Sequence, residues 1–137
     1  MESRTDTRQR LIDSARDLIY TRSYTDVGVQ EICDRAGVRK GSFYHFFPSK
    51  RDLTLAMLDQ FQVFFRNDIL ERAFAADIPP LQRISRFFEY AGDFQQQMKR
   101  DTGQMPGCPF GNIACEMSTR DEAIRLKVEQ IMRDAEI

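Results

Sequence analysis

Hydrogen-bond donors of several kinds gather between Arg39 and Arg51. Four residues of this stretch are basic, and none is acidic. Lysine and arginine neutralise phosphates, and arginine, serine and tyrosine side chains also donate to phosphate oxygens or base edges. Glycine allows a close approach of the backbone because it lacks a Cβ. The residues that we expect to face a nucleic acid are Arg39, Lys40, Gly41, Ser42 and Tyr44.

The spacing of the apolar residues predicts the elements that present these donors. Apolar residues recur at helical spacing over Val29–Ala36 and stop at Gly37, a residue that commonly ends helices. A second short helix begins near Arg39, with Phe43 and Phe46 anchoring it inward. Two short helices joined at a glycine, the second basic and aromatic, are typical of a helix-turn-helix.

Helical periodicity continues through the rest of the chain, and strand-type alternation is almost absent. A first helix is expected at about 6–22, capped by Thr5 or Thr7. Ser49 caps a long helix that closes at Pro79 and Pro80, because proline removes a donor and constrains its neighbour. The next helix runs to about Arg100, with Phe87 and Phe88 on its apolar side. A loop rich in glycine and proline and further amphipathic helices follow, so the predicted fold class is all-α, with a domain border at about 47–52.

Composition excludes several classes of protein. The chain has 137 residues and a net charge of −1, divided into +2 over residues 1–55 and −3 over residues 56–137. No apolar run approaches the roughly 20 residues of a membrane span, and the first thirty residues are charged throughout, so we expect a cytoplasmic protein without a membrane partner. His45 is the only histidine and no Cys-x-x-Cys occurs, which predicts no metal, no cofactor and no catalytic residue.

The segment AGVRKGSFYHFFPSKRDL resembles the DNA-binding signature of the TetR family of transcriptional repressors. The resemblance covers roughly residues 8–55. It implies a three-helix DNA-binding headpiece, here residues 1–50, followed by a helical body, here residues 51–137, that binds a small effector and dimerises. The last two long helices of the family would lie beyond Ile137, so we expect the body to be incomplete at its C-terminus.

The same resemblance implies roles for single residues. It assigns phosphate contacts to Lys40, Tyr44, His45 and Lys50. It assigns base-facing positions to Arg39, Ser42 and Phe43. The Thr or Ser with which the family usually starts its second helix, and which also contacts phosphate, is replaced here by Gly28. The implied partner is a double-stranded DNA operator, bound by a homodimer of the full-length protein.

Phenylalanines of the body have two interpretations, because they can form a core or line an apolar effector pocket. The candidate pocket residues are Phe61, Phe64, Phe65, Phe87, Phe88, Cys108 and Phe110. Cys108 lies just before a helix, whose positive dipole end favours a reactive thiolate. We therefore hypothesise that Cys108 senses an oxidant or electrophile, with simple packing as the alternative.

These observations predict a sequence-specific DNA-binding regulator, a repressor that a small-molecule or electrophile effector releases from its operator. Two other classes stay open. A helical protein-interaction module would show no sequence-specific, salt-dependent DNA binding. An enzyme would need titratable side chains clustered in a concave site, whereas this chain has one histidine and scattered carboxylates, so we expect no enzymatic activity.

Overall fold

The computed structural model of the chain describes residues 3–136. Over this range helices are the only regular elements, which confirms the predicted all-α fold class. In chain order they are α1 (Arg4–Thr21), α2 (Val29–Ala36), α3 (Lys40–Phe46), α4 (Lys50–Phe64), the π-helix η1 (Phe65–Leu70), α5 (Glu71–Ala73), α6 (Pro80–Thr102), α7 (Pro109–Met117) and α8 (Glu122–Asp134).

Capping residues set most of the helix starts. Ser49 accepts a hydrogen bond from the backbone N–H of Asp52 and caps α4, as predicted. The prediction for α1 was wrong, because Ser3, and neither Thr5 nor Thr7, is its N-cap. Ser3 and Asp6 form a reciprocal capping box, which moves the start of the helix to Arg4.

The long helix expected to reach Pro79 is divided in three. After Phe64 it passes into η1 and then into the short α5, and a turn over residues 74–79 precedes α6. A π-helix has a wider turn than an α-helix, and such turns are frequent at functional sites. Here the wider turns bring Phe65 and Ile69 to the same apolar cavity. Hydrophobic spacing alone did not reveal this change of helix type.

A closed core lies in the headpiece, where α1 packs on both α2 and α4, and α2 packs on α3. Its least exposed large side chains are Leu11, Ile12, Ile32, Phe43, Leu53 and Leu58, each no more than 1% exposed. The buried Ser14 hydroxyl donates to the carbonyl of Ile32 at 2.8 Å and ties α1 to α2. Because α4 contributes to this core, the headpiece is packed directly onto the first element of the body.

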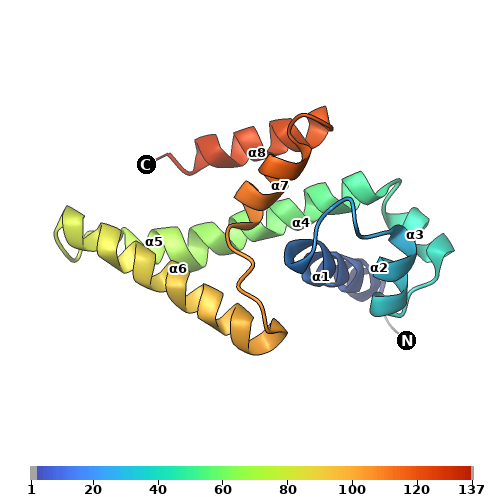
Figure 1. Cartoon of the computed structure of the whole chain (residues 1–137), viewed down its shortest axis with the longest axis horizontal. Helices are drawn as coiled ribbons and strands as arrows, with labels where there is room; N and C mark the ends of the chain where they lie inside the picture. Colours follow the sequence, from blue (N-terminus) through green and yellow to red (C-terminus); the bar gives the residue numbers. More distant parts are fainter. Residues whose placement is uncertain (1–2, 137) are drawn as a thin grey trace.

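The remaining helices build the body along α4. Figure 1 shows α4 leaving the headpiece and continuing through η1 and α5, while α6 returns beside them. The helices α7 and α8 pack on one another, and α8 also packs on α4. None of the residues of α6 is fully buried, and Leu81 and Phe88 are 79% and 67% exposed. No helix within residues 3–136 is long and apolar enough to cross a membrane.

Candidate nucleic-acid interface

The turn between α2 and α3 is built on Gly37, which has a φ of +66°. Its N–H donates to the carbonyl of Asp34 at 3.3 Å, and the N–H of Val38 donates to that of Cys33 at 3.0 Å. These two bonds close the end of α2 in the left-handed conformation that glycine adopts most readily. The turn therefore has the predicted form, and it sets the direction in which α3 leaves α2.

Arg10 of α1 holds the same turn from the side. Its Nη2 donates to the carbonyl of Ala36 at 2.6 Å and to that of Gly37 at 3.0 Å. Carbonyls at a helix C-terminus lack intrahelical partners, and a cation there also favours the helix dipole. Sequence reasoning missed Arg10, because nothing in a single sequence indicates a contact between residues 26 positions apart in the chain.

The outer face of α3 presents most of the predicted donors. The exposed residues here are Arg39, Lys40, Gly41, Ser42, Tyr44 and His45. Phe43 is the exception, because its side chain is 0% exposed and packs edge-on against Tyr44 and beside Phe47. Its burial supports the role of an inward anchor, and the base-facing position that the resemblance implied for Phe43 needs correction. A fully buried ring cannot contact a base edge.

The first turns of α1 add two further basic residues beside α3. Arg4 Nη2 forms a hydrogen bond with His45 Nε2, and the guanidinium of Arg8 lies 5.1 Å from the centroid of the Phe47 ring. Sequence reasoning did not include these two arginines among the DNA-contacting residues. Their spacing of four residues on one helix was the available signal, because it places both on the same face.

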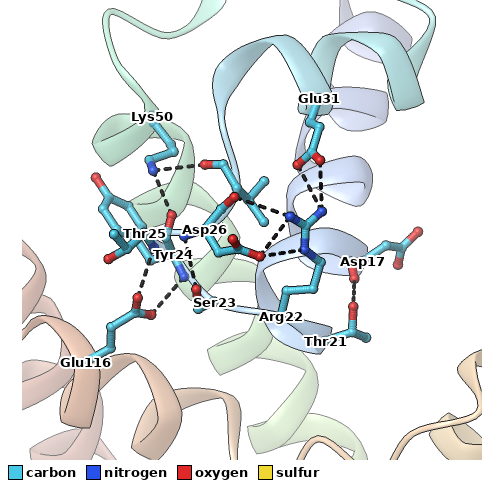
Figure 2. Close-up of polar contacts among 11 residues, drawn as sticks. Asp17, Thr21, Arg22, Ser23, Tyr24, Thr25, Asp26, Glu31, Lys50 and Glu116 are labelled. Atoms are coloured by element: carbon cyan, nitrogen blue, oxygen red, sulfur yellow. Dashed lines mark hydrogen bonds and ion pairs between the residues drawn. The ribbon is translucent and has the colours of Figure 1, made fainter.

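Lys50 is tied to the loop between α1 and α2. Its Nζ donates to the carbonyls of Tyr24 at 2.7 Å and Val27 at 2.9 Å, and lies 4.1 Å from the centroid of the Tyr24 ring (Figure 2). Burial lowers the pKa of this ammonium group, although the negative charge of Glu116 acts to raise it. A phosphate would have to compete with these bonds for Lys50. Gly28, the exposed N-cap of α2, makes no side-chain capping bond.

Glu116 of α7 holds the same loop from the body. Its two carboxylate oxygens accept the backbone N–H groups of Tyr24 at 2.8 Å and Thr25 at 2.9 Å, as Figure 2 shows. Burial alone would raise the pKa of Glu116, but these hydrogen bonds with Thr25 and Tyr24 keep it below its ordinary value. We call this pair of bonds the Glu116 latch. It joins body to headpiece, and sequence reasoning did not find it.

Three ion pairs stabilise the surroundings of the latch. Arg22 pairs with Asp26 at 2.8 Å and with Glu31 at 2.9 Å, which connects the loop to α2 (Figure 2). Arg51, at the start of α4, pairs at 2.6 Å with Asp121, the buried N-cap of α8. The loop that precedes α2 is therefore tied to α2 itself, to α4 and to α7.

An apolar cavity of about 250 Å³ lies in the body. Phe61, Phe64, Phe65, Phe87, Cys108 and Phe110 line it, together with Phe94 and Gln95, which were not among the predicted pocket residues. Phe88 does not line it, because its position on α6 turns its ring outward to 67% exposure. The structure thus brings together all the candidate pocket residues except Phe88.

The loop before α7 closes one side of this cavity. Gln95 donates to the carbonyl of Gly107 at 2.8 Å and accepts the N–H of Gly107 at 2.9 Å. The hydroxyl of Tyr20 on α1 donates to the same carbonyl. Cys108 is exposed, and its Sγ accepts the N–H of Gly111 at 3.4 Å as the N-cap of α7. Within the part of the chain that the structure describes, no cluster of side chains could hold a metal ion.

These features define a helical protein with a helix-turn-helix whose second helix is exposed and basic. Comparison with known proteins agrees. The family model for bacterial regulatory proteins of the tetR family matches residues 11–57. The chain is 35% identical over 118 residues to the transcriptional regulator AcuR of Cereibacter sphaeroides, covering 85% of this chain and 52% of AcuR. It is 30% identical over 129 residues to the transcriptional repressor DhaR of Mycobacterium sp. strain GP1, covering 94% of this chain and 61% of DhaR.

Among solved structures, the regulatory protein TetR from Rhodobacter sphaeroides superposes with a TM-score of 0.77 and 30% identity, covering 92% of this chain and 65% of that one. Residues 11–57 carry the DNA-binding region of the tetR family of bacterial regulatory proteins, and the chain as a whole is similar in sequence and fold to regulators of this family. It spans 52% and 61% of the lengths of AcuR and DhaR. The proteins matched here are regulators, which favours the expectation of a regulator over an enzyme.

Proposed function

We propose that the headpiece binds operator DNA with α3 in the major groove and that the body controls this binding. The observation that carries the proposal is the exposed donor face of α3, which directly follows the Gly37 turn. A major groove admits one α-helix, and the N-terminal residues of a recognition helix contact the base edges. Operator binding would require the full-length protein to act in the cytoplasm, where bacterial DNA lies.

The hydrogen-bond donors of the headpiece fall into two groups, those that contact base edges and those that contact phosphates. Arg39 and Ser42 supply base contacts near the start of α3, while Lys40, Tyr44 and His45 supply phosphate contacts. Arg4 and Arg8 extend the basic surface at the start of α1 and add further phosphate contacts. Gly28 and Gly41 leave the backbone open to a close approach, since nothing lies within 4 Å of a Cβ built at either position. Lys50 acts mainly through the loop over Tyr24–Val27.

The wider assignment rests on the relatives. DhaR is described as a transcriptional repressor, and we propose the same activity here, with a small molecule or electrophile bound in the body causing release. The full-length protein would bind as a homodimer to two half-sites related by two-fold symmetry. We assign DNA binding to the headpiece, residues 1–50, and effector binding and dimerisation to the body, residues 51–137.

The test is a binding titration with the upstream DNA of the protein's own gene, followed by fluorescence anisotropy at several salt concentrations. Replacing Arg39 and Lys40 by alanine should abolish the preference for this DNA over a scrambled duplex. The matched control replaces Lys99 and Arg100, two exposed basic residues on α6, and should leave the preference intact. Equal affinity of both double variants and the unaltered chain for both duplexes would refute the proposal.

A further inference from the structure

The chemistry of the apolar cavity restricts what can occupy it. No charged side chain lines the cavity, and the amide of its one glutamine, Gln95, is already bonded to Gly107. A charged group buried there would lack a partner, which is costly. The cavity is partly open to solvent, whereas a closed apolar cavity of about 150 Å³ already holds benzene. The larger volume of about 250 Å³ therefore fits an uncharged aromatic molecule of one or two rings.

One short helix touches both this cavity and the headpiece. Cys108, Pro109 and Phe110 at the start of α7 line the cavity. Glu116, near the other end of α7, holds the N–H groups of Tyr24 and Thr25. The nine residues of α7 form a rigid rod of roughly 13 Å, because each residue of an α-helix rises about 1.5 Å. A displacement at the start of α7 must therefore move Glu116.

The contact between α7 and α1 leaves room for such a displacement. A cleft of about 620 Å³ separates them, lined by Ile19 and Tyr20 on one side and by Ile113 and Cys115 on the other. Close-packed interiors resist movement, whereas a cleft of this size does not. Phe110, Ile113 and Met117 bury one side of α7 in the core, and its position beside α1 is fixed by directed polar bonds at its two ends. They are the Gly107 contacts at one end and the Glu116 latch at the other.

We propose that the cavity binds an uncharged aromatic molecule, and that its occupancy moves α7 and opens the Glu116 latch. This inference rests on the proposed function, since it assigns a ligand class and a route of control to the body. The released loop is bonded to α2 through Arg22 and Glu31. Opening the latch leaves Lys50 of α4 as the remaining contact that holds this loop from outside, and the loosened loop can shift α2, the helix that positions α3.

The experiment measures amide hydrogen exchange of the chain by NMR, with 2-naphthol as the uncharged probe and naphthalene-2-sulfonate as a charged probe of similar size. Saturating 2-naphthol should accelerate exchange of the Tyr24 and Thr25 amides roughly tenfold, the scale of one lost charge-assisted hydrogen bond. The amides of Leu11 and Ile12, in the fully buried core of α1, should not respond. The sulfonate should leave Tyr24 and Thr25 unchanged, because it carries a charge that the cavity cannot partner.

Variants separate ligand binding in the cavity from opening of the Glu116 latch. Glu116→Ala should show fast exchange at Tyr24 and Thr25 already without a probe, and 2-naphthol should add nothing. The control Glu129→Gln removes a carboxylate that pairs with Arg125 and Arg133 on α8, and it should behave like the unaltered chain. Phe87→Glu places a charge in the cavity lining and should abolish the response while leaving the latch closed.

The outcomes are distinct. Unchanged exchange at Tyr24 and Thr25 with bound 2-naphthol overturns the route through α7. Equal binding of the sulfonate, or of 2-naphthol to Phe87→Glu, overturns the assignment of ligand class and cavity. A clear response in a chain that fails to bind any DNA specifically would refute the proposed function and leave this coupling standing. Specific DNA binding without this response would overturn the coupling through α7 and leave the proposed function standing.

Discussion

The headpiece and α6 differ sharply in how they use their apolar residues. The headpiece buries the ring of Phe43 completely, together with Leu11 and Ile32. Although α6 is the longest helix of the described chain, it buries no side chain fully and exposes 67% of Phe88. The headpiece is therefore the part whose shape its own packing determines. Helix α6 of the body makes only partly buried contacts, so it can shift in position more easily than the headpiece.

This difference agrees with the proposed division of labour. Reading DNA requires a fixed angle between α2 and α3, which the core, Gly37 and Arg10 impose. Responding to a ligand requires a region that tolerates small shifts, and such regions have few fully buried contacts. Matched substitutions in the two regions test this difference in packing.

The largest expected effect compares two phenylalanines. Phe43→Ala should destabilise the chain by about 3 to 5 kcal/mol, because it leaves a cavity in a closed core. Phe88→Ala should change the free energy of unfolding by less than about 0.5 kcal/mol, as for other exposed positions. Urea denaturation followed by circular dichroism measures both. Similar losses in the two variants would show that α6 is as tightly packed as the headpiece.

Two glycines give the next comparison. Gly37→Ala should cost about 1 to 2 kcal/mol, because its φ of +66° disfavours a side chain and the new Cβ would lie 3.2 Å from Arg10 Nη2. Gly92→Ala in the middle of α6 should stabilise by about 0.5 to 1 kcal/mol, since a Cβ there meets nothing within 4 Å. Thermal unfolding of both variants tests the pair. A neutral Gly37→Ala would contradict the account of the turn.

A pair of lysines tests where DNA binding resides. Lys40→Ala should weaken binding to all sequences alike and reduce the slope of log affinity against log salt by about one. Lys99→Ala, its counterpart on α6, should alter neither. Tyr44→Phe should weaken binding less than Lys40→Ala, because it removes a neutral donor only. Salt titrations by anisotropy give all three slopes. The account fails here if the slope changes more in Lys99→Ala than in Lys40→Ala.

The smallest effect is a dependence on pH at the Glu116 latch. Hydrogen bonds lower the pKa of Glu116 in the folded chain, although burial opposes them, so the latch stabilises fully above the ordinary value of 4.5. Its contribution, about 1 kcal/mol for a partly exposed charged hydrogen bond, is lost as the pH falls through the lowered pKa. The stability difference between the unaltered chain and Glu116→Gln should therefore shrink from pH 7 to pH 3. A difference that grows with acid would reverse the assigned sign.

Local patterns in the sequence predicted the headpiece well. Helical spacing and a glycine stop located α2 within Val29–Ala36, and Ser49 was correctly identified as the cap of α4. These features depend on residues close together in the chain. The role of Phe43 needed correction for the same reason, because position within a motif does not show which side of a short helix the core covers.

Long-range contacts escaped prediction. Arg10 meets the Gly37 turn, and Glu116 meets Tyr24 and Thr25, across large separations in sequence. The change from α4 to η1 depends on how Phe65 and Ile69 pack around a cavity, which no periodicity records. Most of the candidate pocket was anticipated because phenylalanines are large and apolar, but Phe88 shows that residue type alone does not decide orientation.

The central claim is that α3 reads a DNA sequence. The most direct measurement is repeated selection of bound duplexes from a random library by this chain, in parallel with Arg39→Ala. The account predicts enrichment of one defined half-site by the unaltered chain, and a changed or relaxed preference at one base pair for Arg39→Ala. Recovery of unselected, random sequences by both chains would contradict it.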